Sequence, residues 1–297
     1  MNARALPSLQ PTPTRHDRGL WTAALLRLLE NRTAMVGGAC LCVLALAGLF
    51  APIVTSYEPT VGDLTQRLQG PSATHLMGTD LLGRDEFTRV LYGARLSLQA
   101  GLVAVVFGVG LGGLIGAIAG AVGGIGDAFL MRVIDVMLAF PGVLLAIGIV
   151  SWLGQGSLQI MVAVGVSYAP TFARLLRGSV LALRQTEYIA AAWAVGATGP
   201  RVLMRHMLPN ALTPVIVRAT LALATAIIDV AALGFLGLGP GDPRIAEWGE
   251  MLTDSARFLQ TAPHLLLFPS AAITVTAVAI NLFGDGLRDS LDPRSSS

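Results

Sequence analysis

Two long stretches without a charged residue constrain this chain more than any other feature. Residues 97–122 carry no charge over 26 positions, and residues 136–173 carry none over 38. A helix needs about 20 apolar residues to cross the roughly 30 Å of hydrocarbon in a bilayer. The first stretch therefore fits one crossing and the second fits two, and the sequence predicts an all-α integral membrane protein.

The composition agrees with this prediction. Only 13% of the 297 residues are charged, whereas a soluble domain carries roughly 25%. The mean hydropathy is +0.67, so membrane lipid is the expected surrounding for most of the surface. Nothing in the sequence indicates a nucleic-acid partner.

About six transmembrane helices are predicted. The long run 136–173 is divided at Gly154-Gln155-Gly156, and Asp127, Arg132 and Asp135 are interpreted as a short turn before it. A cleaved secretory signal ending at Ala47 is the alternative for the first apolar run, but a long polar leader favours a membrane helix. The predicted spans are 33–57, 97–122, 133–153, 157–173, 211–238 and 265–284.

The arginines predict the orientation, because basic residues collect on the cytoplasmic side of a membrane. With the amino terminus inside, 13 arginines fall in cytoplasmic segments and six in outside segments. Both termini are therefore predicted to be cytoplasmic. The predicted parts are tails at 1–32 and 286–297, an extracytoplasmic loop at 58–96, a core membrane domain at 97–285 and, within it, a cytoplasmic loop at 174–210.

Several kinds of chemistry are excluded or disfavoured. All 20 basic residues are arginine, so neither a Walker A lysine nor a Schiff-base lysine exists in this chain. Any use of ATP must rely on a partner's nucleotide site. Cys40 and Cys42 lie two positions apart on one helix and so point about 200° apart, which excludes a bridge between them. The four histidines lack ligand spacing. We therefore expect no metal site, and a membrane-anchored enzyme is disfavoured.

The second span carries a glycine at every fourth position, which predicts a stripe of close approach along one helix face. Packing within the bundle is one interpretation, and an interface with a second membrane subunit is the other. The glycines are Gly108, Gly112, Gly116, Gly120 and Gly124.

The polar segment 181–210 is too long for a simple turn. Glu187–Val195 is alanine-rich and predicts a helix, and Gly196 follows it. Val202–Leu208 predicts a second short helix limited by Pro209. Two short helices joined by a bend at Gly196 favour a docking element, and an amphipathic linker lying on the membrane surface is the alternative.

This segment resembles the coupling loop of binding-protein-dependent ABC (ATP-binding cassette) importer permeases. The family pattern is Glu-Ala-Ala, three residues, Gly, nine residues, Ile, one residue, Leu-Pro. Ala190 replaces the usual Glu and His206 the usual Ile, and whether Glu187 takes over for the missing acid stays open. The matching positions are Ala191, Ala192, Gly196, Leu208 and Pro209.

Three further stretches resemble the C-type permeases of the dipeptide, oligopeptide, glutathione and nickel branch. They lie at residues 75–98, 235–249 and 284–293, and the resemblance extends from about residue 34 to residue 293. It implies a type I ABC importer permease fold in a multi-pass protein of the inner (cytoplasmic) membrane.

The resemblance also implies partners. These are a homologous second permease, two cytoplasmic ABC ATPases that hold ATP and Mg²⁺, and an extracytoplasmic solute-binding protein whose natural contacts are 56–95 and 240–264. It implies no cofactor and no catalysis in this chain. Which solute is carried stays open. The rival class is a self-sufficient secondary transporter or channel, which commonly has several intramembrane ionisable groups.

Asp229 is the one acid well inside an apolar span, where a charge costs about 2.5–3.5 kcal/mol on insertion scales. Such a residue is expected to face protein or water. One interpretation is a contact on the translocation path, to a peptide amino group or another cation. The other is an ion pair or hydrogen bond with a partner subunit.

Overall fold

The structure, a computed structural model, describes residues 20–242 and 244–291, and its long helices have the lengths that a membrane requires. Five apolar segments are long enough to cross, and a sixth is formed by α5 (Gly124–Leu138) and α6 (Gly142–Leu153), which meet at a 95° bend. The prediction of about six spans in an all-helical membrane protein is confirmed. The five are α2 (Arg32–Leu49), α4 (Glu86–Val122), α7 (Ser157–Arg184), the stretch Gly199–Leu238 containing α10 (Leu208–Leu233), and α12 (His264–Leu291).

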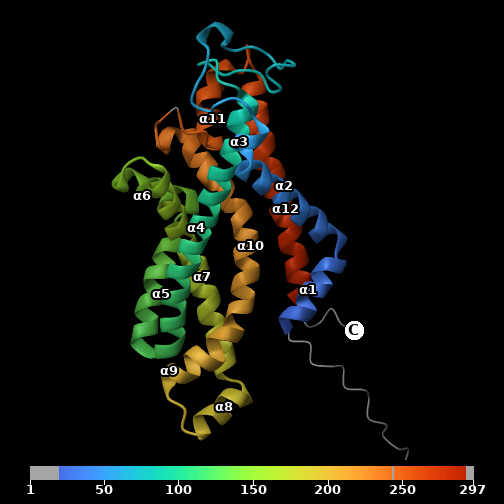
Figure 1. Ribbon diagram of the computed structural model, residues 1–297. Helices are drawn as coiled ribbons and strands as arrows, with labels where there is room; N and C mark the ends of the chain where they lie inside the picture. Colours follow the sequence, from blue (N-terminus) through green and yellow to red (C-terminus); the bar gives the residue numbers. More distant parts are fainter. Residues whose placement is uncertain (1–19, 243, 292–297) are drawn as a thin grey trace, which may run out of the picture.

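The long helices run side by side between two ends that carry loops and short helices (Figure 1). Helices α4, α7 and α10 pack against one another, and α12 packs against α10 and α2. One end carries residues 55–85 and α11 (Trp248–Ser255), and the opposite end carries α8 (Glu187–Ala194) and α9 (Gly199–Val202). The remaining short elements are α1 (Leu20–Glu30), α3 (Ala51–Val54), η1 (Leu64–Gln66), η2 (Leu203–Met207), η3 (Gly234–Leu238) and η4 (Ala256–Phe258).

The glycine stripe of α4 packs against α7 of the same chain. A Cβ on Gly108 would lie within 3 Å of the Gly165 carbonyl oxygen. A Cβ on Gly112 or Gly116 would overlap the carbonyl oxygen of Ala169 or Ala173. Because backbone meets backbone along this face, α7 occupies the space that a second subunit would need there.

The last predicted member of the stripe, Gly124, does not belong to it. Helix α4 ends at Val122, Gly123 adopts φ = +67°, and Gly124 begins α5 with φ = +58°. A Cβ on Gly124 would meet nothing within 4 Å. Gly120, one turn earlier, still faces α7 through Val180.

The predicted turn at Asp127, Arg132 and Asp135 is wrong, because these residues lie inside α5. Both Asp127 carboxylate oxygens accept hydrogen bonds from the Arg177 guanidinium at 2.5 Å, and Asp135 accepts one from Arg174 at 2.7 Å. The two aspartates therefore join α5 to α7. Because each is paired with an arginine, neither interrupts the helix.

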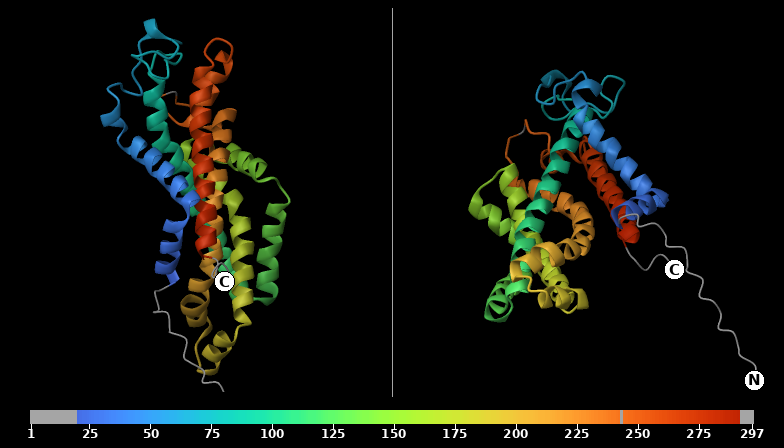
Figure 2. Two further views of the ribbon diagram at one scale, coloured as in Figure 1. Left: turned by 90° about the vertical axis from the view of Figure 1, so that its right-hand side faces the viewer. Right: turned by 60° about the horizontal axis from the view of Figure 1, so that its bottom comes forward.

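The third and fourth predicted spans also differ from the structure. Span 133–153 is bent rather than straight, because α5 stops at Leu138 and Pro141 precedes α6 (Figure 2). Span 157–173 continues to Arg184, so the connection to α8 is only residues 185–186. The long predicted loop 174–210 is thus mostly helix.

Helix α4 begins eleven residues before the predicted span, at Glu86 instead of residue 97. Asp85 caps it by accepting from the Thr88 N–H at 2.8 Å. The predicted outer loop 58–96 therefore ends at residue 85. The predicted tails 1–32 and 286–297 lie partly outside the described residues, and their described parts belong mainly to α1 and α12.

Candidate functional site

The element formed by α8 and α9 has one buried face and one exposed face. Ile189 of α8 and Val202 of α9 are fully buried, and both belong to the main core of the bundle. On the other side Trp193 is 44% exposed and Val195 is 87% exposed. The element is therefore anchored from within and presents apolar side chains outward, beyond the ends of the long helices (Figure 1).

Gly196 ends α8 in the left-handed conformation, at φ = +83°. Its N–H donates to the Trp193 carbonyl at 2.9 Å, and the Ala197 N–H donates to the Ala192 carbonyl at 3.1 Å. This pair of bonds is the Schellman motif, which closes a helix on a residue at positive φ. A Cβ on Gly196 would meet nothing within 4 Å, so backbone conformation rather than space requires glycine there.

The second short helix does not end at Pro209. The chain passes from α9 through the π-helical turn η2 into α10, and Pro209 lies in the first turn of α10. The His206 carbonyl accepts from the Asn210 side chain at 2.9 Å and from the Tyr188 hydroxyl at 3.5 Å. Proline has no backbone N–H to donate, and the first turn of a helix tolerates this. Pro209 therefore does not break the helix. Leu208 is half-buried and packs against the core.

The exposed side of α8 holds both Ala190, where the family pattern has a glutamate, and Glu187, which carries the nearest acid. Ala190 and Ala191 are exposed, and Glu187 is exposed one turn before Ala190. Glu187 lies in the first turn of α8, where a negative charge favours the helix. A carboxylate is thus present on this surface, displaced by three positions from the usual place.

A groove of about 410 Å³ lies between this element and the end of α4. It is apolar apart from Arg184, and its walls come from the end of α4 and from four elements within residues 184–207 that are distant from α4 in sequence. The lining includes Gly120, Val122, Trp193, Pro200, Met204 and Met207. Trp193 and Met204 were not singled out by the sequence pattern, although their apolar character in a polar segment is a detectable signal.

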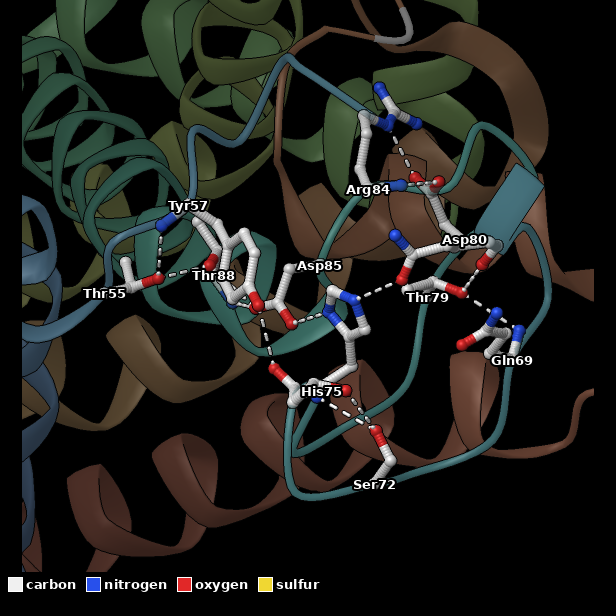
Figure 3. A network of polar contacts seen from close by, with 12 residues as sticks. Thr55, Tyr57, Gln69, Ser72, His75, Thr79, Asp80, Arg84, Asp85 and Thr88 are labelled. Atoms are coloured by element: carbon white, nitrogen blue, oxygen red, sulfur yellow. Dashed lines mark hydrogen bonds and ion pairs between the residues drawn. The ribbon is translucent and has the colours of Figure 1, made fainter. Parts of the chain in front are cut away.

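The opposite end of the molecule, which we call the outer end after its predicted side of the membrane, is held by a buried polar network (Figure 3). The Asp85 carboxylate contacts His75 Nδ1 at 2.9 Å and accepts from the Thr88 hydroxyl at 2.7 Å. The Thr88 hydroxyl lies 2.6 Å from that of Thr55, at the start of the outer segment. The polar residues that resemble the C-type permeases are thus structural here, because they fasten the outer segment to the first turn of α4.

A second part of this network surrounds Asp80. Its carboxylate accepts from the Arg84 backbone N–H at 2.9 Å and from the Arg84 side chain at 2.6 Å, and Arg89 lies at 3.5 Å. Arg89 is 1% exposed and also donates to the Pro59 carbonyl at 3.1 Å. A buried arginine needs such partners, so this group fixes the loop over α4.

The two outer segments, 56–95 and 240–264, pack together. Trp248 is fully buried, and its ring N–H donates to the Val90 carbonyl at 3.1 Å. A Cβ on Gly93 would lie 2.7 Å from the Trp248 ring. Glu247 caps α11 and accepts from the Ser97 hydroxyl at 3.1 Å. The outer surface is thus built from both segments.

One buried carboxylate in this outer region lacks a full set of partners. Glu250 is 8% exposed, and its Oε2 atom has no hydrogen-bond partner. Burial raises the pKa of the Glu250 carboxyl above its ordinary value, and the nearby carboxylates of Asp254 and Glu247 raise that pKa further. Ionised Glu250 therefore destabilises the folded state.

We expect the Glu250→Gln variant to unfold at a higher temperature than the wild type near pH 8, by the equivalent of about 1–3 kcal/mol. A raised pKa in the folded state means that folding favours the protonated acid. The destabilisation is complete above the folded pKa and disappears as the pH falls through it. Thermal unfolding of the purified protein near pH 8 and near pH 5 measures this.

The measurement near pH 5 is the control, because the Glu250 carboxyl is mostly protonated there in the folded state. Glu250→Gln is expected to give little stabilisation at that pH. An equal melting temperature for Glu250→Gln and the wild type near pH 8 would contradict the assignment of Glu250 as an uncompensated charge.

Asp229 lies on α10, half-buried, and is not isolated. The Tyr168 hydroxyl of α7 donates to its Oδ2 atom at 2.8 Å. This bond does not decide between a path contact and a subunit contact, because one carboxylate oxygen is still available. No group of metal-ligating side chains occurs among residues 20–242 and 244–291.

Comparison with known proteins agrees with this geometry. The family model described as the binding-protein-dependent transport system inner membrane component matches residues 112–297. The model for the N-terminal TM domain of oligopeptide transport permease C matches residues 19–71.

Curated relatives extend over nearly the whole chain. A dipeptide transport system permease protein of Alkalihalophilus pseudofirmus is 47% identical over 93% of this chain and 91% of its own length. A glutathione transport system permease protein of Pectobacterium atrosepticum is 40% identical over 93% of this chain and 92% of its own length. A chain of the inward-facing MetNI methionine ABC transporter matches with a TM-score of 0.57 and 21% identity, covering 68% of this chain and 96% of that one.

The fold and the projecting α8–α9 element define a multi-pass permease subunit of the cell membrane, with the type I ABC importer fold. The chain belongs to the family of binding-protein-dependent transport system inner membrane components. Members of this family are permeases, and ATP hydrolysis belongs to separate subunits. Membership implies a partner permease, an ATPase and a binding protein.

Proposed function

We propose that this chain is the C-type permease of a di- or oligopeptide importer and forms half of the path with one homologous permease. The dipeptide relative supports this solute, since its 47% identity exceeds the 40% of the glutathione relative. Two cytoplasmic ATPases would hold ATP and Mg²⁺. A solute-binding protein would contact residues 56–95 and 240–264.

The observation that carries the proposal is the α8–α9 element. Buried Ile189 and Val202 fix it to the bundle, while Trp193 and Val195 stay exposed. Exposed apolar side chains on a rigid, projecting element are typical of a protein contact surface. An ATPase seated there would bias the bundle between two states, since a ligand shifts an equilibrium through its differential affinity.

Mild detergent purification of the tagged chain tests the assembly. We expect one homologous membrane chain and one or two nucleotide-binding chains to co-purify. The double variant Trp193→Ala and Val195→Ser is expected to lose the nucleotide-binding chains and keep the membrane partner, because both side chains lie on the exposed side of the α8–α9 element and neither belongs to the buried core. Solute movement by the purified chain alone, without nucleotide, would contradict the proposal and favour a secondary transporter.

Uptake by the complete complex tests the solute. We expect ATP-dependent import of a short alanine peptide, and we expect excess unlabelled dipeptide to compete better than excess glutathione. Stronger competition by glutathione would assign the chain to the glutathione branch instead.

A further inference from the structure

Three polar residues of α10 lie on one face of the helix. Thr225 follows Arg218 by seven positions and Asp229 follows it by eleven. At 3.6 residues per turn, all three point within about 20° of the same direction. We call these three residues and Tyr168 the polar lane. Arg218 and Thr225 are exposed, and Asp229 is half-buried.

Tyr168 joins this face from α7. Its hydroxyl donates to Asp229 at 2.8 Å, and it also interacts with Thr225 and, electrostatically, with Arg218. The lane therefore has a held carboxylate at one end, hydroxyl groups in the middle and a guanidinium at the other end.

One side of the polar lane is packed and the other side is open. On the packed side, buried Val215 and Ala222 of α10 belong to the main core of the bundle. Pro214 and Ile228 flank the lane and are exposed. Arg218 forms no ion pair with any residue of 20–242 or 244–291. A charge inside a span faces water or a partner of opposite charge rather than lipid.

Asp229 and Arg218 lie at different heights along α10. Asp229 lies four residues from the end of α10 that adjoins η3 and α11, on the side of the outer end. Arg218 lies nearer the end that adjoins η2 and α9. Eleven positions separate them by about 16 Å along the helix axis.

We infer that the polar lane recognises the two charged termini of a zwitterionic oligopeptide in transit, with Asp229 contacting the ammonium group and Arg218 contacting the carboxylate. This inference rests on the proposed function. An extended peptide spans about 3.3–3.6 Å per residue, so a peptide of about five residues reaches both charges together. A shorter peptide meets the acid and the arginine in turn.

The test uses the reconstituted complex and pentaalanine with free, N-acetylated or C-amidated termini. Import by each variant is divided by wild-type import of the same peptide, which cancels any preference of the binding protein. Asp229→Asn is expected to reduce import of the free and amidated peptides about tenfold and to spare the acetylated one. Arg218→Gln is expected to reduce the free and acetylated peptides and to spare the amidated one. Tenfold corresponds to about 1.4 kcal/mol, or about one charged contact.

The results distinguish a failure of the polar lane from a failure of the proposed function. An equal loss of import for all three peptides would overturn the role of the polar lane and leave the proposed function standing. It would indicate that Asp229 serves packing, or that Arg218 contacts a lipid headgroup. No import of any peptide by the wild-type complex would overturn the proposed solute and the lane together. Arg218→Lys keeps the positive charge and is expected to import the acetylated peptide better than Arg218→Gln does. If an assembled Arg218→Lys complex shows no such rescue, the role of the polar lane is also overturned.

Discussion

The Gly112→Ala variant is expected to lose most of its folded, monodisperse protein in detergent. A Cβ at this position would overlap the Ala169 carbonyl oxygen and lie within 3.0 Å of the Ala169 Cα. Because backbone atoms cannot rotate away as a side chain can, α4 and α7 must separate along the central contact of the bundle. Overpacking of this kind costs about 1–3 kcal/mol or more.

Gly110→Ala is the matched control, two positions away on the same helix. A Cβ on Gly110 would meet nothing within 4 Å. Alanine favours helix over glycine by about 0.5–1 kcal/mol, so this variant is expected to be at least as stable as the wild type. Size-exclusion yield and thermal unfolding measure both. Equal behaviour of the two variants would refute the packing role of Gly112.

The Gly196→Val variant is expected to assemble with its ATPases and to lose stimulation of ATP hydrolysis by substrate. Its backbone conformation, at φ = +83°, is an outlier for a β-branched residue. Holding valine there costs about 1–3 kcal/mol. The chain is expected to relieve this strain by opening the two bonds of the Schellman motif, so the angle between α8 and α9 changes.

Two controls separate conformation from side-chain bulk. Gly196→Asn is expected to retain coupling, because asparagine tolerates the left-handed region. Gly199→Ala is expected to be neutral, since its Cβ would make only an ordinary contact, 3.6 Å from Trp193. Substrate-stimulated ATPase activity of the reconstituted complex is the measurement. Wild-type coupling in Gly196→Val would remove this glycine from the mechanism.

The membrane class and the number of spans follow from hydropathy, but several boundaries do not. Helix α4 starts at Glu86 because Asp85 caps it and Arg89 in its first turns pairs with Asp80 of the outer network. A hydropathy argument treats Arg89 and Arg95 as signs of a loop. It cannot detect a helix that continues beyond the membrane into a buried ion network.

Charge pairing between distant segments explains the error in α5. Asp127 is followed in sequence by 49 residues before its partner Arg177. A sequence pattern shows each charge separately and so favours a turn, whereas the folded chain places them together. Gly196 was predictable for the opposite reason, because a helix end at positive φ is a local property. Which residues lie near Gly196 in the folded chain could not be predicted from the sequence.

Helix α4 contains no proline over its 37 residues, a length of about 55 Å. Its first residue follows Asp85 of the outer network, and its last turn lines the groove beside Trp193. An uninterrupted rod cannot shorten between its ends, so an axial displacement of the outer surface equals the displacement at the groove wall. An axial movement on one side of the bilayer is thus transmitted through α4 to the other side.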